Sequence, residues 1–156
     1  MVMGPIEAQA LTASVISMLD PAVASRVSVS ARADLPVLQG DERLLRIALL
    51  NLLENAGKYA PGESPIHVTL KPCHKEGVPG LEWHIEDSGP GVPPGMEERI
   101  FEKYTRVSES SGTAGLGLGL YLVRHIFKHH GGSASAESGR STGACFIVWL
   151  PAAKTK

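Results

Sequence analysis

Two asparagines and a lysine in the segment NLLENAGKY have the types and spacing that suit metal and phosphate binding. Asn51, Asn55 and either Lys58 or Tyr59 share one face of a helix, because residues three and four apart are neighbours. A neutral carboxamide oxygen can ligate Mg²⁺ while phosphates provide the negative charge, and Lys58 can contact phosphate as a point charge. An amphipathic helix with an ordinary polar, solvent-facing side is the alternative.

A carboxylate followed by two glycines, at Asp87, Gly89 and Gly91, offers a site for a purine base. A carboxylate at the end of a strand can accept a hydrogen bond from the amino group of adenine. Guanine presents an oxygen acceptor at that place and would be repelled. The glycines permit positive φ angles and a close approach of the backbone to a flat base. A surface turn closed by an Asx-type hydrogen bond is the competing interpretation.

Alternating glycines at positions 115 to 120 predict a phosphate-binding turn at the start of a helix. Such a turn leaves backbone N–H groups bare, and the helix behind it adds a favourable dipole. The spacing is not that of a Rossmann fingerprint, and no P-loop pattern occurs in the chain. A flexible surface loop is the alternative. The residues of this turn are Gly115, Leu116, Gly117, Leu118, Gly119 and Leu120, of which the last two leucines can bury and hold it.

An aromatic pair, Phe101 and Tyr104, lies between the purine and phosphate segments. Aromatic residues three apart on a short helix most often belong to the core, and this is our default interpretation. In a functional interpretation the pair anchors the start of a movable lid. Arg106 then contacts phosphate or a partner domain.

The apolar pattern that must position these residues predicts an α+β fold. We expect a two-layer α/β sandwich, in which three helices cover one face of a mixed sheet. Helices are predicted over residues 5–19, from a cap at Asp41 to about residue 58, over 97–104 and over 120–130. Strands are predicted over 27–31, around 37–38, and over 66–70, 81–85, 133–137 and 144–150.

Length and composition predict one ordinary globular domain. The chain has 156 residues, of which 43% are hydrophobic and 20% charged, and its formal net charge is -1. No global field therefore attracts nucleic acid or an anionic membrane, and we expect neither as a partner. Cys73 and Cys145 form no CxxC pair, so we expect packing residues in a reducing cytoplasm. The longest apolar run, residues 44–53, is too short to span a bilayer, although a longer parent protein anchored in the inner membrane is compatible with the sequence.

Four segments, in order, resemble the conserved boxes of sensor histidine kinases. NLLENAGKYAP resembles the N box, DSGPG the G1 box, IFEKYTRV the F box and GLGLGLYLVRHIFKHHGG the G2 box. The resemblance covers residues 11–151, so we expect residues 1–156 to form a single ATP-binding catalytic domain. It implies the Bergerat fold that gyrase, Hsp90 and MutL ATPases share, with ATP and Mg²⁺ as cofactors.

The resemblance also implies a role for each matching position. Asn55 would ligate Mg²⁺ with the support of Asn51, while Lys58 would touch phosphate and Tyr59 would lie against the nucleotide. Asp87 would bind the adenine amino group. Residues 108–114 would form the ATP lid, although the absence of Lys and Arg between Val107 and Gly115 departs from many members of the family. The walls of the site would be shaped by Gly89, Gly91, Gly115, Gly117 and Gly119.

Position 51 separates phosphoryl transfer from hydrolysis. Bergerat ATPases carry a glutamate four residues before the Mg²⁺-binding asparagine, where it activates water. Here that residue is Asn51, whose carboxamide cannot take a proton at neutral pH, and Glu54 should point to another face of the helix. The sequence therefore favours transfer of the phosphoryl group over hydrolysis.

The resemblance implies donation of the γ-phosphoryl group to a histidine on a separate dimerisation domain, and from there to a response regulator. None of the six histidines of this chain is followed by an acid, as the family's acceptor usually is, so we expect the acceptor elsewhere. We expect the isolated domain to be monomeric. Without its acceptor domain, we expect its phosphotransferase activity to be absent or very slow. Two alternatives remain open: a Ser/Thr kinase of the anti-sigma-factor type with the same fold, and a non-catalytic nucleotide-sensing module.

Overall fold

The computed structural model describes residues 1–59, 62–89, 91–92, 95–102, 119–138 and 143–154. Four α-helices, one 3₁₀ turn and seven strands lie within these ranges. In chain order they are β1 (Gly4–Ile6), α1 (Ala8–Ser17), α2 (Pro21–Ala24), β2 (Val27–Ala31), β3 (Leu38–Gly40), α3 (Glu42–Tyr59), β4 (Ile66–Pro72), β5 (Gly80–Glu86), η1 (Arg99–Phe101), α4 (Gly119–His129), β6 (Ser133–Ser138) and β7 (Ala144–Pro151).

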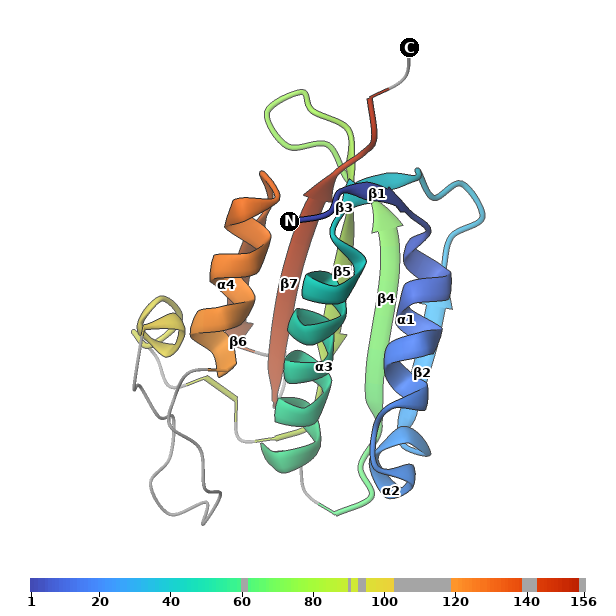
Figure 1. Ribbon diagram of the computed structural model, residues 1–156. Helices are drawn as coiled ribbons and strands as arrows, with labels where there is room; N and C mark the ends of the chain where they lie inside the picture. Colours follow the sequence, from blue (N-terminus) through green and yellow to red (C-terminus); the bar gives the residue numbers. More distant parts are fainter. Residues whose placement is uncertain (60–61, 90, 93–94, 103–118, 139–142, 155–156) are drawn as a thin grey trace.

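Five of the strands form one mixed sheet in the order β2-β4-β5-β7-β6. The edge pair β2 and β4 is parallel, and the other three pairs are antiparallel. Helices α1, α3 and α4 lie side by side on one face of this sheet (Figure 1). The predicted two-layer α+β sandwich is therefore confirmed.

The core lies between the helices and the sheet, because β4 and β5 alternate buried apolar residues with polar ones and β7 is apolar along most of its length. On β5, Trp83 is fully buried and its ring meets Phe127 of α4 edge to face, with 6.1 Å between ring centroids. Its indole Nε1 donates to Thr12 Oγ1 of α1 at 2.9 Å. One aromatic residue of the sheet thus contacts both outer helices.

The alternate residues of β4 and β5 form a polar face that is turned away from the helices. On β5 these residues are Glu82, His84 and Glu86, which flank the buried Trp83 and Ile85. Cys145 of β7 lies directly opposite Glu86 in the antiparallel register.

The beginning of the chain corrects the helix predicted over residues 5–19. Pro5 and Ile6 belong to β1, which pairs antiparallel with β3, and α1 begins only at Ala8. Ile6 is 4% exposed. It is apolar because it is buried in a strand, and the partner of that strand is distant in sequence. The Asp20-Pro21 dipeptide follows this helix and begins α2, because Asp20 Oδ1 accepts a hydrogen bond from Ala22 N at 2.9 Å.

The helix predicted over residues 97–104 is also wrong for its described part. Only the 3₁₀ turn η1 forms there, and the backbone turns extended at Glu102, with φ −78° and ψ 153°. Residues 103 and 104 lie outside the described ranges. The other predicted helices and strands are confirmed within a few residues at their ends. Among the described residues, none of the helices combines the length and the hydropathy that crossing a bilayer requires.

Candidate functional site

Helix α3 carries the predicted metal and phosphate ligands, and Asp41 fixes where it begins. Asp41 Oδ1 accepts hydrogen bonds from Arg43 N at 3.0 Å and from Leu44 N at 3.3 Å, which is the predicted N-cap. Asn51 and Asn55 are half-buried on the helix flank, and Lys58 is exposed. Tyr59 is the last residue of the helix. The buried stripe that turns this flank towards the site consists of Leu45, Leu49, Leu52 and Leu53.

The C-terminal end of α3 is held by Arg26, which the sequence analysis missed. Arg26 donates from Nη1 to the carbonyl oxygen of Gly57 at 3.3 Å and from Nε to that of Ser64 at 2.8 Å. A glycine inside a helix costs about 1 kcal/mol relative to alanine. Here it has a packing reason, because a Cβ on Gly57 would lie 2.9 Å from a methyl group of Val23.

Asp87 follows the last residue of β5 and is half-buried. Its Oδ1 accepts hydrogen bonds from Gly89 N at 2.8 Å and from Ala144 N at 3.3 Å. Burial raises the pKa of the Asp87 carboxyl, while these two hydrogen bonds and the Arg26 charge act in the opposite direction. Oδ2 receives no hydrogen bond from the residues that the structure describes. The Asx-type bond is therefore present, yet it leaves one carboxylate oxygen available to a ligand.

The loops on either side of Asp87 approach each other backbone to backbone. Gly91 has φ +83°, and a Cβ placed on it would lie 2.9 Å from the carbonyl oxygen of Gly143. A Cβ on Gly143, whose φ is +103°, would collide with the carbonyl oxygen of Asp87. Only glycine fits at 143 without displacing the carboxylate's backbone. The sequence analysis missed Gly143, whose one signal is a glycine placed directly before a strand.

The start of α4 lies next to α3. Asn51 Oδ1 is 4.0 Å from the position that a Cβ would take on Gly119, the first residue of α4. Leu120 is partly buried and packs against the core, as predicted. Gly119 and Leu120 are the only described members of the predicted phosphate turn; Gly115, Leu116, Gly117 and Leu118 lie outside the described residues, as do Tyr104 and Arg106.

Phe101 is a core residue, which agrees with the default interpretation for this member of the aromatic pair. It is 3% exposed, and its ring meets Phe146 edge to face at 6.4 Å. The guanidinium of Arg124 lies 4.1 Å from the centroid of the same ring. Arg124 also donates to Glu98 Oε2 at 2.7 Å and, from Nη2, to Ala134 O at 2.9 Å. Arg124, which the sequence analysis did not single out, therefore attaches the segment before residue 103 to α4 and β6.

The predicted site residues that are described gather at one end of the molecule. The C-terminal half of α3, the end of β5, the beginning of β7 and the beginning of α4 all lie at the lower end in Figure 1. A half-buried carboxylate, two amides on one helix flank and a helix N-terminus are thus brought to the same end. This set can accept from a base amino group, offer oxygen to a cation and face an anion.

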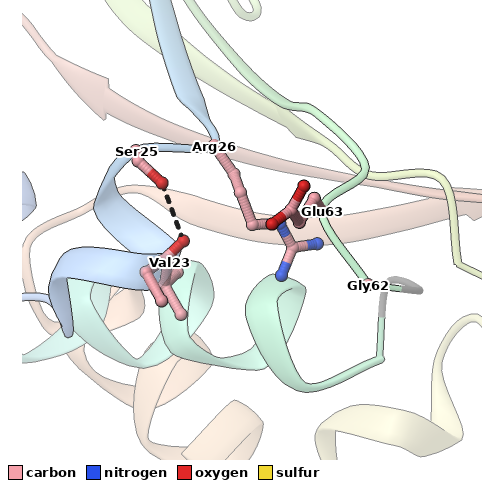
Figure 2. Close-up of a pocket in the computed structure, with 6 residues that line it drawn as sticks. Val23, Ser25, Arg26, Gly62 and Glu63 are labelled. Carbon is pink, nitrogen blue, oxygen red and sulfur yellow. Dashed lines mark hydrogen bonds between the residues drawn. The ribbon is translucent and has the colours of Figure 1, made fainter.

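Two described cavities are lined by other residues. One, of about 400 Å³, opens beside the C-terminal end of α3 and is lined by Val23, Ser25, Arg26, Gly62 and Glu63, together with Ala22 (Figure 2). The other, of about 740 Å³, lies between the hairpin that joins β4 to β5 and the turn after α4. None of the described residues predicted to bind a ligand lines either cavity.

Comparison with known proteins gives consistent matches. The family model described as "Histidine kinase-, DNA gyrase B-, and HSP90-like ATPase" matches residues 40–154. Sensor protein KdpD of Escherichia coli K12 is 40% identical over 138 residues, which are 88% of this chain and 15% of that protein. The sensory kinase SasA of Gloeothece citriformis is 40% identical over 118 residues, which are 76% of this chain and 29% of SasA. The chain thus spans less than a third of the length of either relative.

A solved structure agrees over almost the whole chain. Full-length ShkA, crystallised in complex with AMPPNP, superposes with a TM-score of 0.79 and 28% identity, over 99% of this chain and 32% of ShkA.

Proposed function

Because the chain belongs to the family of histidine kinase-, DNA gyrase B- and HSP90-like ATPases, we propose that it binds Mg-ATP and donates the γ-phosphoryl group to a histidine on a separate dimerisation domain. The two curated relatives compared above are sensor kinases and are much longer than this chain. We propose that residues 1–156 form the single catalytic domain of such a protein, with the core at about residues 11–151. A response regulator would then receive the phosphoryl group.

The observation that carries this proposal is the half-buried carboxyl of Asp87 with one oxygen open. A buried carboxyl with a raised pKa gains most from a donor that stabilises its charge, and the amino group of adenine is such a donor. The two loops approach each other through the backbone at Gly91 and Gly143, where neither glycine brings a side chain that would compete with a flat base. That ShkA was crystallised with AMPPNP supports the proposal that this chain binds a nucleotide.

The other groups fit the phosphates and the metal ion. Asn55 offers a carboxamide oxygen to Mg²⁺ from a half-buried position, and Asn51 lies one turn before it beside the start of α4. Lys58 is exposed one turn later and can reach an anion. Mg-ATP supplies the phosphoryl group for transfer, and the ion offsets the charge of its phosphates. The chain's own residues bind and orient the nucleotide and remove part of its surrounding water.

A proton acceptor for water is what distinguishes hydrolysis from transfer at such a site. Asn51 stands where Bergerat ATPases place a glutamate, and an amide cannot act as a general base. Glu54 is exposed and is the direct neighbour of Asn55, so it lies on a different side of α3. We therefore propose slow turnover by the isolated chain, and a nucleophile provided by the acceptor domain.

The direct test is a transfer assay. The chain is mixed with γ-labelled Mg-ATP and with the dimerisation domain of its parent protein, and the labelled product is treated with acid. We expect label on the dimerisation domain that is lost in acid, as phosphohistidine is, and no label when its histidine is replaced by glutamine. Asn55→Ala should abolish the transfer, whereas Glu54→Gln, one residue away, should retain it.

The remaining outcomes decide between the alternatives. Acid-stable label on serine or threonine would favour the anti-sigma-factor type of kinase. Absence of Mg-ATP binding in calorimetry would favour a module without catalytic function and would contradict our proposal. We further propose that the isolated domain is monomeric, because dimer contacts would belong to the other domain, and that it works in the cytoplasm, where ATP and the response regulator are available.

A further inference from the structure

Three side chains of different ligand type meet on the polar face of the sheet, outside the proposed nucleotide site. His84 and Glu86 come from β5, and Cys145 comes from β7. One ligand atom from each lies within 4.8 Å of the other two. His84 Nδ1 and Cys145 Sγ are 4.0 Å apart, and Cys145 is directly opposite Glu86 in the strand register. The juxtaposition follows from strand pairing, so the backbone holds it in place.

The imidazole of His84 is already oriented for binding through Nδ1. Its other nitrogen, Nε2, lies 2.8 Å from Glu82 Oε1. When the Glu82 carboxylate accepts this hydrogen bond, Nε2 is the donor, and the neutral tautomer protonated there presents the Nδ1 lone pair beside Cys145. Glu82 is 9% exposed, and Lys75 Nζ lies 3.9 Å from its second oxygen. A carboxylate that fixes the far nitrogen of a histidine is the usual support of a metal-bound imidazole.

The ligand types select the kind of metal. Thiolate, imidazole and carboxylate together favour Zn²⁺ over Mg²⁺ or Ca²⁺, which prefer oxygen alone. In a tetrahedral zinc site, nitrogen and sulfur ligands are about 3.6 Å apart, given the usual bond lengths. The observed 4.0 Å between Nδ1 and Sγ needs only a small contraction. Glu86 is exposed and can turn towards the other two atoms by side-chain rotation.

We propose that His84 Nδ1, Cys145 Sγ and a carboxylate oxygen of Glu86 bind one Zn²⁺ ion, with water as the fourth ligand. Binding converts the Cys145 thiol to the thiolate, and the proton passes to solvent. The ion would join β5 to β7 next to Asp87 and Ala144, the pair that shapes the proposed base site. The zinc site is nevertheless separate, because its ligands lie on the opposite face of the sheet from the helices.

The test is titration of the chain with Co²⁺, which reports thiolate coordination by a charge-transfer absorption band, and with Zn²⁺ by calorimetry. His125 and His129 lie one helical turn apart on α4, edge to face with 4.4 Å between ring centroids, and offer a competing pair. The titrations are therefore repeated in a His125→Gln/His129→Gln background. We expect one equivalent of metal to bind in both proteins, with the same thiolate band.

Variants of the ligands and of their neighbours make the result specific. Cys145→Ser should remove the thiolate band, and His84→Ala should lower the affinity for zinc at least as much as Glu82→Gln. Glu82→Gln should lower it by roughly 10- to 100-fold, as loss of a supporting carboxylate does. Two matched controls should retain the thiolate band: Cys73→Ser, at the other cysteine, and His67→Gln, at an exposed histidine that contacts Ser28 on the same face.

The proposal is overturned if Co²⁺ gives no thiolate band, if Cys145→Ser binds zinc as tightly as the unmodified chain, or if Cys73→Ser removes binding. Thermal melting separates these outcomes from misfolding. Zinc should raise the melting temperature of the unmodified chain and of both controls. Zinc should leave the melting temperature of Cys145→Ser unchanged. Without metal, all of these proteins should have the same melting temperature.

Discussion

Asp87 combines a charge, partial burial and one open oxygen in a single residue. Because burial raises the pKa of its carboxyl, the folded chain binds protons more tightly at this position than the unfolded chain does. Between the unfolded and the folded pKa the free energy of unfolding therefore falls as the pH rises. Asp87 is a destabilising residue at neutral pH, a property that is common where a group is kept for binding.

Asp87→Asn should weaken ATP binding without weakening the fold. The amide oxygen can still accept from Gly89 N and Ala144 N, so the loop should keep its shape. Loss of a charged acceptor should lower the affinity for ATP by roughly 10- to 150-fold and reduce the discrimination against GTP. Calorimetry with ATP and with GTP measures the two affinities. Urea unfolding between pH 4 and 8 tests whether the variant keeps the stability of the fold.

The control is Glu86→Gln, which changes the neighbouring carboxylate on the other side of the strand. It should leave both nucleotide affinities unchanged. If Asp87→Asn discriminated between ATP and GTP as strongly as the unmodified chain does, Asp87 would not be part of the base site.

At the scale of elements, α3 depends on a cap that also holds the beginning of the chain. Asp41 Oδ1 caps the helix, while Oδ2 accepts from Val2 N at 2.8 Å. His130, which is 6% exposed, completes the junction, because its Nε2 accepts from Asp41 N at 3.0 Å and its Nδ1 contacts the carbonyl oxygen of Ile126. His130 thus joins the end of α4 to the start of α3.

Asp41→Asn should lower stability at neutral pH but not in acid. The hydrogen bond from Val2 is the main cause that lowers the pKa of the Asp41 carboxyl from its ordinary value of 3.8. A lowered pKa stabilises the fold above the unfolded value, and this contribution is lost as the pH falls through the folded value. Asparagine keeps the cap and loses only the charge. Urea unfolding should therefore show a difference at pH 7 that shrinks below about pH 4; a difference independent of pH would contradict this explanation.

Arg124 should be required to hold the segment around η1 against α4. Arg124→Ala removes its hydrogen bonds to Glu98 and Ala134 and its contact with the Phe101 ring. We expect a loss of about 1–3 kcal/mol in the free energy of unfolding, measured in urea, and faster hydrogen exchange over residues 96–102. Lysine should not restore the loss, because it lacks the planar fork. Lys128→Ala, exposed on the same helix, is the control.

The sequence predicts elements well where their signals are local. The cap at Asp41 and the alternation of β4 and β5 are local, and each was found where predicted. The strand β1 was missed because its reason is distant: Ile6 pairs with Leu38, and its apolar spacing also suits a helix. Gly143, Arg26 and Arg124 act through backbone contacts far along the chain, for which local spacing gives no signal.

At the scale of the whole molecule, the two layers are joined by a single buried core beneath α1, α3 and α4. The apolar pattern of the sequence predicts the two layers. It does not predict the strand order, in which β7 lies between β5 and β6. This order places Ala144 beside Asp87 and Cys145 beside Glu86. The proposed base site and the proposed zinc site therefore share one pair of strands, which no segment taken alone reveals.

Thr12→Val should weaken the attachment of α1 to the sheet. The hydroxyl of Thr12 accepts from Trp83 Nε1 and donates to the carbonyl oxygen of Ala8. Without it, a fully buried indole N–H loses its partner, and we expect a loss of about 1–3 kcal/mol in the free energy of unfolding. Thr12→Ser keeps the hydroxyl and should lose less. Urea unfolding followed by circular dichroism measures both, and equal stability of Thr12→Val and the unmodified chain would contradict the role of this bond.

The backbone contact at Gly143 bears on how mutations near the base site should be interpreted. Gly143 and Ala144 support Asp87 with a missing side chain and a peptide N–H, so neither brings a functional group that chemical intuition would select. A substitution at residue 143, or a proline at residue 144, would impair ligand recognition although no ligand-contacting residue had been replaced. Such losses would look like general misfolding in a cellular screen, although their origin is the displacement of one carboxylate.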